Sequence, residues 1–215
     1  GLGTGINNVD GSSAGSTIEY TPNMLPDGLT ARLAYTPDAS GGTANDLASS
    51  AGAASNPEGA GYDITLSATD AVHGMAGLTV WAGVSKIEQE AQANYSGDQD
   101  EQTIAISYAV GDFTVGYQWS EEDLGTSANE KQYENNGYGI TFNVNDDLSI
   151  GYNHYESEQL SGTTYTTAEA TSIQVAYSAG GASIRIAESD AKNTAYQTTS
   201  AFDKSGTTLS VALAF

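Results

Sequence analysis

Short segments in which apolar and polar residues alternate recur along almost the whole chain. The segment FTVGYQW at 113–119 is the clearest, because its apolar residues occupy the odd positions and its small or polar residues the even ones. The same alternation occurs in YDITLSA at 62–68 and in YGITFNV at 138–144. Because side chains along a strand point alternately to its two faces, this period predicts β-strands with one apolar and one polar face.

Ten or eleven such strands are expected, and turn residues separate them. We place them at 15–21, 28–36, 61–69, 77–86, 102–110, 112–120, 137–145, 148–156, 171–179, 182–189 and 206–215. Alternating segments of about 10 residues are typical of outer-membrane barrels, whose apolar face contacts lipid and whose polar face surrounds water. A soluble β-sandwich shows the same period, so the alternation alone leaves both architectures open.

The connections between these strands alternate in length. Short ones are expected at 22–27, 70–76, 111–112, 145–147 and 179–181, and long ones at 37–60, 87–101, 121–136, 157–170 and 190–205. Outer-membrane barrels have short turns at one rim and longer loops at the other. The alternation therefore favours an all-β fold, a transmembrane antiparallel up-and-down β-barrel, over a sandwich.

Composition narrows the class further. The 27 acidic and 6 basic residues give a formal charge of −21, which argues against nucleic-acid binding because phosphate contacts require a basic surface. There is no cysteine, so neither a disulfide framework nor a Cys-based metal site is possible in this chain. No run approaches the ~18–20 apolar residues of a membrane helix. The sequence begins at Gly1 without an initiator methionine, and we interpret it as processed or incomplete.

Many acidic residues are expected in the long loops. They include Glu88, Glu90, Asp98, Asp100 and Glu101 in one loop and Glu121, Glu122, Asp123, Glu130 and Glu134 in another. A solvated rim explains such a charge run. Alternatively, some of these carboxylates bind Ca²⁺ or Mg²⁺, hard cations that take oxygen ligands, and bridge to lipopolysaccharide. No loop has the spacing of an EF-hand, so no metal site is named.

Tyrosine is abundant, with 13 residues. Many of these lie on the apolar face near a strand end: Tyr20, Tyr35, Tyr62, Tyr108, Tyr138, Tyr152 and Tyr177. A ring with an apolar body and a polar tip suits a membrane interface, where barrels carry aromatic girdles. Core packing in a sandwich also favours tyrosine, so this observation supports the barrel without deciding for it.

Two segments resemble the general porins of Gram-negative outer membranes, which are trimers of 16-stranded barrels. The segment GSTIEYTPNMLPDGLTARLAYTPDA at 15–39 is similar to the hairpin that follows the porin constriction loop. The terminal TTLSVALAF at 207–215 is similar to the last porin strand, whose final aromatic residue is read by the barrel-assembly machinery. Counting back from Phe215 makes 15–21 the sixth strand, and residues 1–14 the tail of the constriction loop.

The resemblance implies that residues 1–215 form a single barrel domain that lacks its first five strands. It also implies a location in the outer membrane, contact with lipid and lipopolysaccharide, a homotrimer, and recognition of Phe215 during assembly. An odd number of strands supports the view that sequence is missing, because bacterial single-chain barrels use even numbers.

The polar faces of the expected strands carry candidate pore-lining residues. By parity these are Glu19, Arg32, Asp63, Gln118, Asn143, Asn153, Gln174 and Arg185. In the family, basic wall residues face acidic residues of the constriction loop, which implies such a role for Arg32. Arg185 is the other mid-strand basic residue on the polar face, and a wall arginine paired with a neighbouring carboxylate is an equal alternative for it. Glu19 could supply an opposing charge.

The resemblance implies passive diffusion of ions and small hydrophilic solutes through a water-filled channel, with no cofactor and no covalent chemistry. The excess of carboxylates predicts a preference for cations. The alternative is an acidic, calcium-stabilised secreted surface or S-layer-like β protein, which would bury the apolar face that a barrel exposes to lipid.

A barrel enzyme, such as an outer-membrane lipase or protease, is a third possibility. GLGTG at 1–5 is not preceded by a strand or followed by a helix, as a nucleotide-binding turn would be. His73 and His154 are expected at opposite rims, and neither has the spacing of a triad or a metal site. We therefore predict that the chain is not an enzyme.

Overall fold

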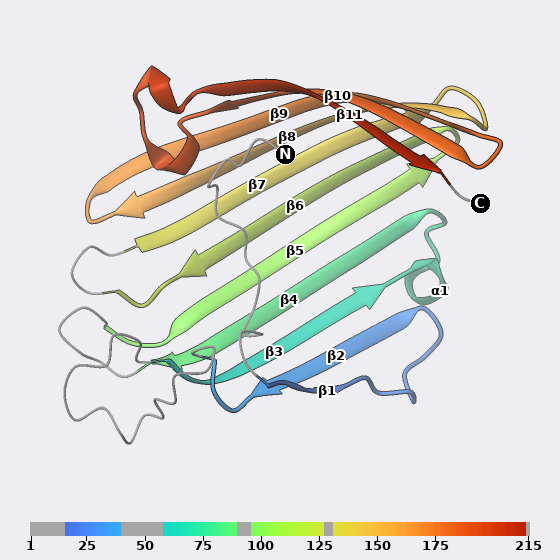
Figure 1. Ribbon diagram of the computed structural model, residues 1–215. Coiled ribbons are helices and arrows are strands. Elements are labelled where there is room, and N and C mark those ends of the chain that lie inside the picture. The colour runs from blue at the N-terminus through green and yellow to red at the C-terminus, as the bar shows by residue number, and fades with distance from the viewer. Residues whose placement is uncertain (1–15, 40–57, 90–95, 127–130, 214–215) are drawn as a thin grey trace.

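The computed structural model describes residues 16–39, 58–89, 96–126 and 131–213, and these form one antiparallel β-sheet (Figure 1). Each of the eleven strands pairs with its neighbours in sequence, from β1 to β11. The strands are β1 Ile18–Tyr20, β2 Leu29–Thr36, β3 Glu58–Ala68, β4 Leu78–Gln89, β5 Gln99–Val110, β6 Phe113–Asp123, β7 Lys131–Asn143, β8 Leu148–Ser161, β9 Thr164–Ala179, β10 Ala182–Lys192 and β11 Lys204–Leu213. The predicted up-and-down order is confirmed.

The sheet curves around an open centre, and β1 and β11 are its two edges (Figure 1). Within the described ranges these edges do not pair with each other, so the barrel is not closed. Residues 1–14, predicted to be the tail of a constriction loop, lie outside the described residues. The numbering of the strands as six to sixteen stays a prediction.

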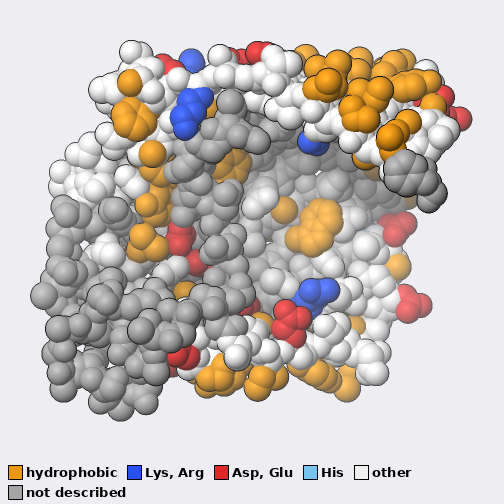
Figure 2. Space-filling view, in the orientation of Figure 1, with side chains coloured by type: hydrophobic (Ala, Val, Ile, Leu, Met, Phe, Trp, Pro, Cys, Tyr) orange, Lys and Arg blue, Asp and Glu red, His pale blue; other side chains and the backbone are white. Residues whose placement is uncertain are grey.

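The apolar face of the sheet is not covered by a second layer. Val115 lies opposite Tyr108 on one side and Ile140 on the other, and Val115 and Ile140 are 41% and 43% exposed. The buried hydrophobic residues of the described ranges are five alanines and Ile87. Figure 2 shows hydrophobic side chains gathered along the outer rim, around a hollow centre. A sandwich would bury this face, so the architecture disagrees with the soluble surface-protein alternative.

The strands extend further than predicted on the side of the long connections. β7 begins at Lys131 instead of 137, β8 continues to Ser161, and β9 begins at Thr164. The predicted long loop at 157–170 is therefore wrong, because only residues 162–163 connect these two strands. In these extensions both faces carry polar residues, so hydrophobic alternation disappears although the backbone ladder continues.

The predicted position of the acidic residues in loops is consequently wrong for most of them. Glu88 lies in β4, Asp100 and Glu101 in β5, and the residues from Glu121 to Asp123 in β6, while Glu134 lies in β7. Asp98 does lie in a connection, and Glu90 and Glu130 are outside the described residues. These carboxylates thus have fixed faces on the sheet.

The connections on the other side are short, as predicted. The connection between β3 and β4 holds a four-residue helix, α1 Asp70–His73. On the opposite side, the connection between β10 and β11 holds two 3₁₀ turns, η1 Thr194–Tyr196 and η2 Ser200–Phe202. Over the described ranges, the structure contains no helix long and apolar enough to cross a membrane.

Candidate functional site

The ladder places all eight predicted pore-lining residues on the polar face of the sheet. At the β1 edge, Glu19 and Asp63 both lie opposite Ala34, and Arg32 is the next residue of β2 on that face. Arg32 is exposed and forms no ion pair with the residues that the structure describes. Three charged side chains from three adjacent strands therefore form one cluster, which we call the edge cluster.

The other five predicted residues lie among small neighbours. Gln118 lies opposite Ala105 and Gly137, and Asn153 lies opposite Gly139 and Ser172. Gln174 lies opposite Gly151 and Ala187, and Asn143 opposite Ser149. Small neighbours leave these amides room to reach solvent on the concave side of the sheet.

Arg185 lies opposite Ala176 and Ser210, and it is exposed. No ion pair joins it to a carboxylate in the described part of the chain. The alternative of a wall arginine neutralised by a neighbouring acid is therefore not what the structure shows. Its charge is available to whatever occupies the space in front of it.

Four further residues of the polar face were missed by the sequence interpretation: Trp81, Glu101, Glu122 and Lys204. Glu101 and Glu122 were assigned to loops, yet they lie opposite each other and are buried. Trp81 lies opposite Ser67 and Ala105. The alternation within this strand could have placed Trp81 on the polar face, because Trp81 occupies an odd position like the small or polar residues Thr79, Gly83 and Ser85.

Hydrogen bonds join the strand extensions on the polar face. The amide of Gln99 donates to Glu101 and Glu122 over 2.8 and 2.9 Å, and the amide of Gln159 donates to the Tyr133 hydroxyl over 2.7 Å. Burial raises the pKa of the Tyr133 phenol, while the bond from Gln159 opposes that shift. This network fixes the end of the wall beyond the apolar band.

The network continues to the connection between β10 and β11. The Tyr133 ring lies 5.4 Å from the ring of Tyr196, whose hydroxyl is 2.6 Å from the Ser157 hydroxyl. The polar face is therefore a wall with hydrogen-bonded side chains at one end and exposed single groups along its length.

A family comparison agrees with this wall. The family model described as Gram-negative porin matches residues 1–214. The chain belongs to the Gram-negative porin family. The porin is accordingly an outer-membrane protein, as the resemblance implied, and its location in that membrane follows from the family. No curated protein sequence matches the chain.

Solved outer-membrane proteins share the fold of this porin. OmpT, an outer membrane protein of Vibrio cholerae, is 12% identical with a TM-score of 0.60, over 91% of this chain and 60% of that one. An anion-selective porin from Comamonas acidovorans is 11% identical with a TM-score of 0.61, over 82% and 48%. The outer membrane channel DcaP of Acinetobacter baumannii is 12% identical with a TM-score of 0.60, over 99% and 67%.

At these identities the likeness shows the fold alone. The porin chain spans 60% of the length of OmpT.

The outward face of the porin carries aromatic residues whose polar tips point toward the strand extensions. The Tyr117 hydroxyl donates to Asn136 over 2.7 Å, and the Trp119 indole donates to Glu134 over 3.3 Å. Tyr35 and Tyr62 pack at 5.3 Å, and the Tyr62 hydroxyl donates to Glu88. An apolar body with a hydrogen-bonded tip suits a membrane interface, and the aromatic girdle stays a prediction.

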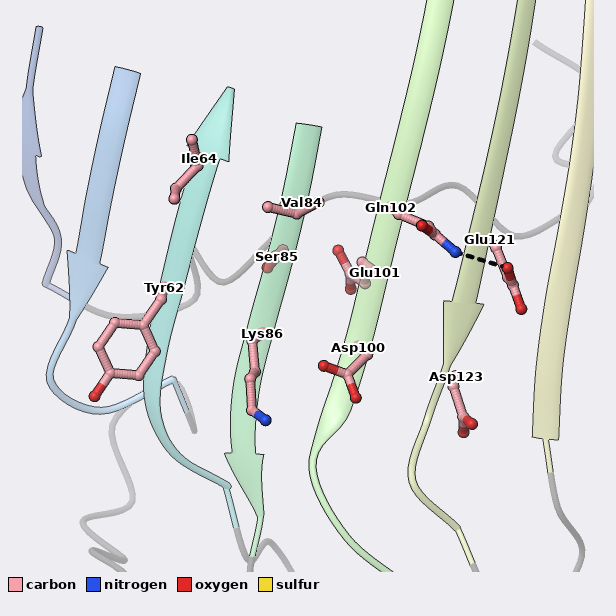
Figure 3. Close-up of a pocket in the computed structure, with 10 residues that line it drawn as sticks. All are labelled: Tyr62, Ile64, Val84, Ser85, Lys86, Asp100, Glu101, Gln102, Glu121 and Asp123. Carbon is pink, nitrogen blue, oxygen red and sulfur yellow. Dashed lines mark hydrogen bonds between the residues drawn. The ribbon is translucent and has the colours of Figure 1, made fainter. Parts of the chain in front are cut away.

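A cavity lies on this outward face, where the apolar band meets the charged extensions (Figure 3). Its volume is about 580 Å³, and Figure 3 shows Tyr62, Lys86, Asp100 and Asp123 in one row across the strands, with Ile64 and Val84 in the row beside it. Lys86 pairs with Asp98 at 2.8 Å. That bond holds the pKa of Asp98 below its ordinary value, against the effect of burial, and raises the pKa of Lys86.

Charge is distributed unequally between the two faces of the porin. On the wall, the described side chains are four acids (Glu19, Asp63, Glu101, Glu122) and three bases (Arg32, Arg185, Lys204). On the outward face of the extensions the described side chains include ten acids and two lysines: Glu88, Asp100, Glu121, Asp123, Glu134, Glu156, Glu158, Glu169, Glu188, Asp190, Lys86 and Lys192. Most of the net charge therefore does not face the hollow.

Neither histidine belongs to a catalytic arrangement among the described residues. His73 lies in α1 and accepts a hydrogen bond from the Met75 backbone, and His154 contacts Glu156 at 2.8 Å on the outward face of β8. Within the described ranges no group of three or more His, Cys, Asp or Glu could hold a metal ion. The predicted calcium or magnesium in the loops stays a prediction.

Proposed function

We propose that this porin forms a water-filled channel for passive diffusion of ions and small hydrophilic solutes across the outer membrane. One observation carries the proposal: a single ladder places exposed polar and charged side chains on the concave face and exposed aliphatic side chains on the convex face. In a bilayer, this arrangement surrounds water and contacts hydrocarbon. We propose no enzymatic activity and no cofactor for it.

We further propose a modest preference for cations. The support is the wall itself, where the described side chains include four carboxylates and three cationic groups, and not the formal charge of −21. Charged groups at a constriction set ion preference, whereas outward carboxylates are separated from the lumen by the sheet. The edge cluster contributes two acids and one base to this balance.

The test is the reversal potential of the full-length porin in planar bilayers under a KCl gradient. Cation preference is expected for the unmodified protein. Replacement of Glu19 and Asp63 by Gln and Asn should shift the potential toward anions, and Arg32→Ala should shift it toward cations. Anion preference of the unmodified porin would overturn the proposal.

The matched control removes two carboxylates of the same type from the outward face. Glu121→Gln with Asp123→Asn makes the same change in net charge, yet these residues lie on the convex side of β6. The reversal potential of this control should stay at the unmodified value. An equal shift from both pairs would show that net charge, and not the wall, sets the preference.

We propose that further strands complete the sheet and that the porin assembles as a homotrimer in contact with lipid and lipopolysaccharide. The unpaired edges of β1 and β11 support completion, because a free sheet edge inside a bilayer leaves backbone groups without hydrogen bonds. We also propose that Phe215 is the residue read by the barrel-assembly machinery, although it lies outside the described residues. Electrophoresis of unheated and heated samples and chemical cross-linking test the trimer.

A further inference from the structure

Trp81 is an exposed aromatic side chain on the polar wall. It lies opposite Ser67 on β3 and Ala105 on β5, and it is 41% exposed. Among the described residues its ring contacts no other aromatic ring, and its indole nitrogen has no hydrogen-bond partner. The indole therefore leaves a large apolar surface in contact with the water of a solvent-filled channel.

The other tryptophan of the chain shows what a structural role looks like here. Trp119 lies on the outward face, and its indole nitrogen donates to Glu134 over 3.3 Å. It is accounted for as part of the interfacial girdle. Trp81 has neither the outward position nor the bonded tip, so the girdle does not explain it.

The surroundings of Trp81 are small and uncharged. Thr79 and Gly83 precede and follow it on the same face of β4, so no bulky side chain covers the indole from its own strand. Beyond Ala105, the next wall residue in the same row is the exposed Gln118. Hydroxyl and amide groups thus lie beside an open aromatic surface, and the wall residues next to Trp81 in its own row carry no formal charge.

Trp81 also lies at a depth that solutes must pass. Its chain neighbours Val80 and Ala82 face outward and lie opposite Ala68, Ile106, Leu66 and Ile104, which belong to the apolar band. The indole is therefore within the membrane-spanning part of the wall and not at its rim.

We propose that Trp81 is a binding platform for neutral, ring-shaped hydrophilic solutes, of which carbohydrates are the class. The indole stacks on the apolar face of a sugar ring, while Ser67 and Gln118 offer hydrogen bonds to its hydroxyl groups. This inference rests on the proposed channel function, because it assigns a specificity-determining residue to the same wall.

The experiment measures block of the ion current by maltose in planar bilayers that contain the full-length porin. Maltose should block the unmodified channel in a concentration-dependent manner. Trp81→Ala should weaken the block about tenfold, the value of one aromatic stacking contact. Trp81→Phe should retain most of the affinity, and Trp119→Phe should leave the block unchanged. The open-channel conductance should persist in all three variants.

Two further solutes, an acyclic polyol and an aromatic compound, test whether the site recognises the ring of a carbohydrate. Mannitol has hydroxyl groups but no ring face, so it should not block. Phenol that blocks as strongly as maltose would overturn the assignment to carbohydrates, and equal block of Trp81→Ala and unmodified channels would overturn the platform itself.

Fluorescence separates this inference from the proposed channel function. In the Trp119→Phe variant, maltose should protect a fraction of the emission from quenching by iodide, and the additional Trp81→Phe change should abolish the protection. Protection without any conductance would keep the binding platform and overturn the channel. Conductance without protection or block would keep the channel and overturn the platform.

Discussion

Glu101 and Glu122 lie directly opposite each other in the ladder between β5 and β6, and both are buried. The side-chain amide of Gln99 donates a hydrogen bond to each of them. Two like charges in opposite positions destabilise a sheet, and hydrogen bonds to a buried carboxylate offset that effect. Gln99 therefore holds together two strand extensions that carry the same charge.

We predict that Gln99→Leu lowers the free energy of unfolding by about 1–3 kcal/mol, because it removes hydrogen bonds to two buried carboxylates. The measurement is the unfolding transition of the porin in detergent, followed by the change in electrophoretic migration with temperature. Gln102→Leu is the matched control, since that amide donates to Glu121 on the exposed outward face over 2.9 Å. Its effect should stay within about 0.5 kcal/mol, and equal losses in both variants would contradict the role of Gln99.

The pair of Lys86 and Asp98 predicts a local dependence on pH. The Lys86 ammonium holds the pKa of Asp98 below its ordinary 3.8, so the pair is complete above that value and is lost as pH falls through the lowered pKa. The pKa of Lys86 is raised above 10.5, so its contribution is complete below 10.5 and is lost as pH rises through the raised pKa.

Hydrogen exchange of the peptide that contains Gln89 should measure the acid side of this window, because the Gln89 backbone donates to Asp98 over 3.1 Å. Exchange should be faster in Asp98→Asn than in the unmodified porin near neutral pH. The difference between the two proteins should disappear once the pH falls below the lowered pKa of Asp98. A difference that stays constant down to the lowest pH would show that the pair does not anchor this end of β4.

Hydrophobic alternation was sufficient to predict the strands that cross the apolar band. It located FTVGYQW at 113–119 within β6, because the two sides of the sheet there contact different surroundings. It failed from Lys131 to Asn136, from Ser157 to Ser161 and from Thr164 to Ala170, where both faces carry polar groups and only the backbone ladder defines a strand. Pairing with a neighbour is not visible in a local pattern.

The sequence pattern likewise identified some residues of the candidate site and missed others. Parity placed Glu19, Arg32 and Arg185 on the polar face, because each lies in a segment with clear alternation. Glu101 and Glu122 were missed because their segments lack it. Trp81 was missed for a different reason: a tryptophan in an apolar run is ordinarily counted with the lipid face, although Trp81 shares the parity of Thr79 and Gly83, and the register with Ser67 places it on the wall.

We predict that a charge is tolerated on one face of β6 and not on the other. Val115→Arg places a guanidinium among Tyr108 and Ile140 on the lipid side, and it should lower stability by about 2–4 kcal/mol. Thr114→Arg is the adjacent control on the wall, where water can solvate the charge, and it should change stability by less than about 1 kcal/mol. Refolding into lipid vesicles at increasing urea measures both. A larger loss for Thr114→Arg would reverse the assignment of the two faces.

Two glycines of the connection between β3 and β4 allow the effect of a steric clash on stability to be separated from the effect of backbone strain. Gly74 and Gly77 have φ angles of +74° and +80°, which side chains other than glycine rarely adopt. A Cβ at Gly74 would meet open space, whereas a Cβ at Gly77 would lie 2.1 Å from the carbonyl oxygen of Ala109 in β5. The backbone of Ala109 also donates to the carbonyl of Gly77 over 2.9 Å. Gly77 is therefore the point where the turn packs on the sheet.

We predict that Gly74→Ala lowers the free energy of unfolding by about 1–2 kcal/mol, which is the cost of the left-handed conformation alone. Gly77→Ala adds the overlap with Ala109 and should reach about 3–5 kcal/mol, in the range that marks a severe steric conflict. Urea unfolding of both variants in the same detergent gives the difference directly. Equal losses would mean that the turn moves away from β5 at no further cost, so that its contact with the sheet does not fix the end of the wall.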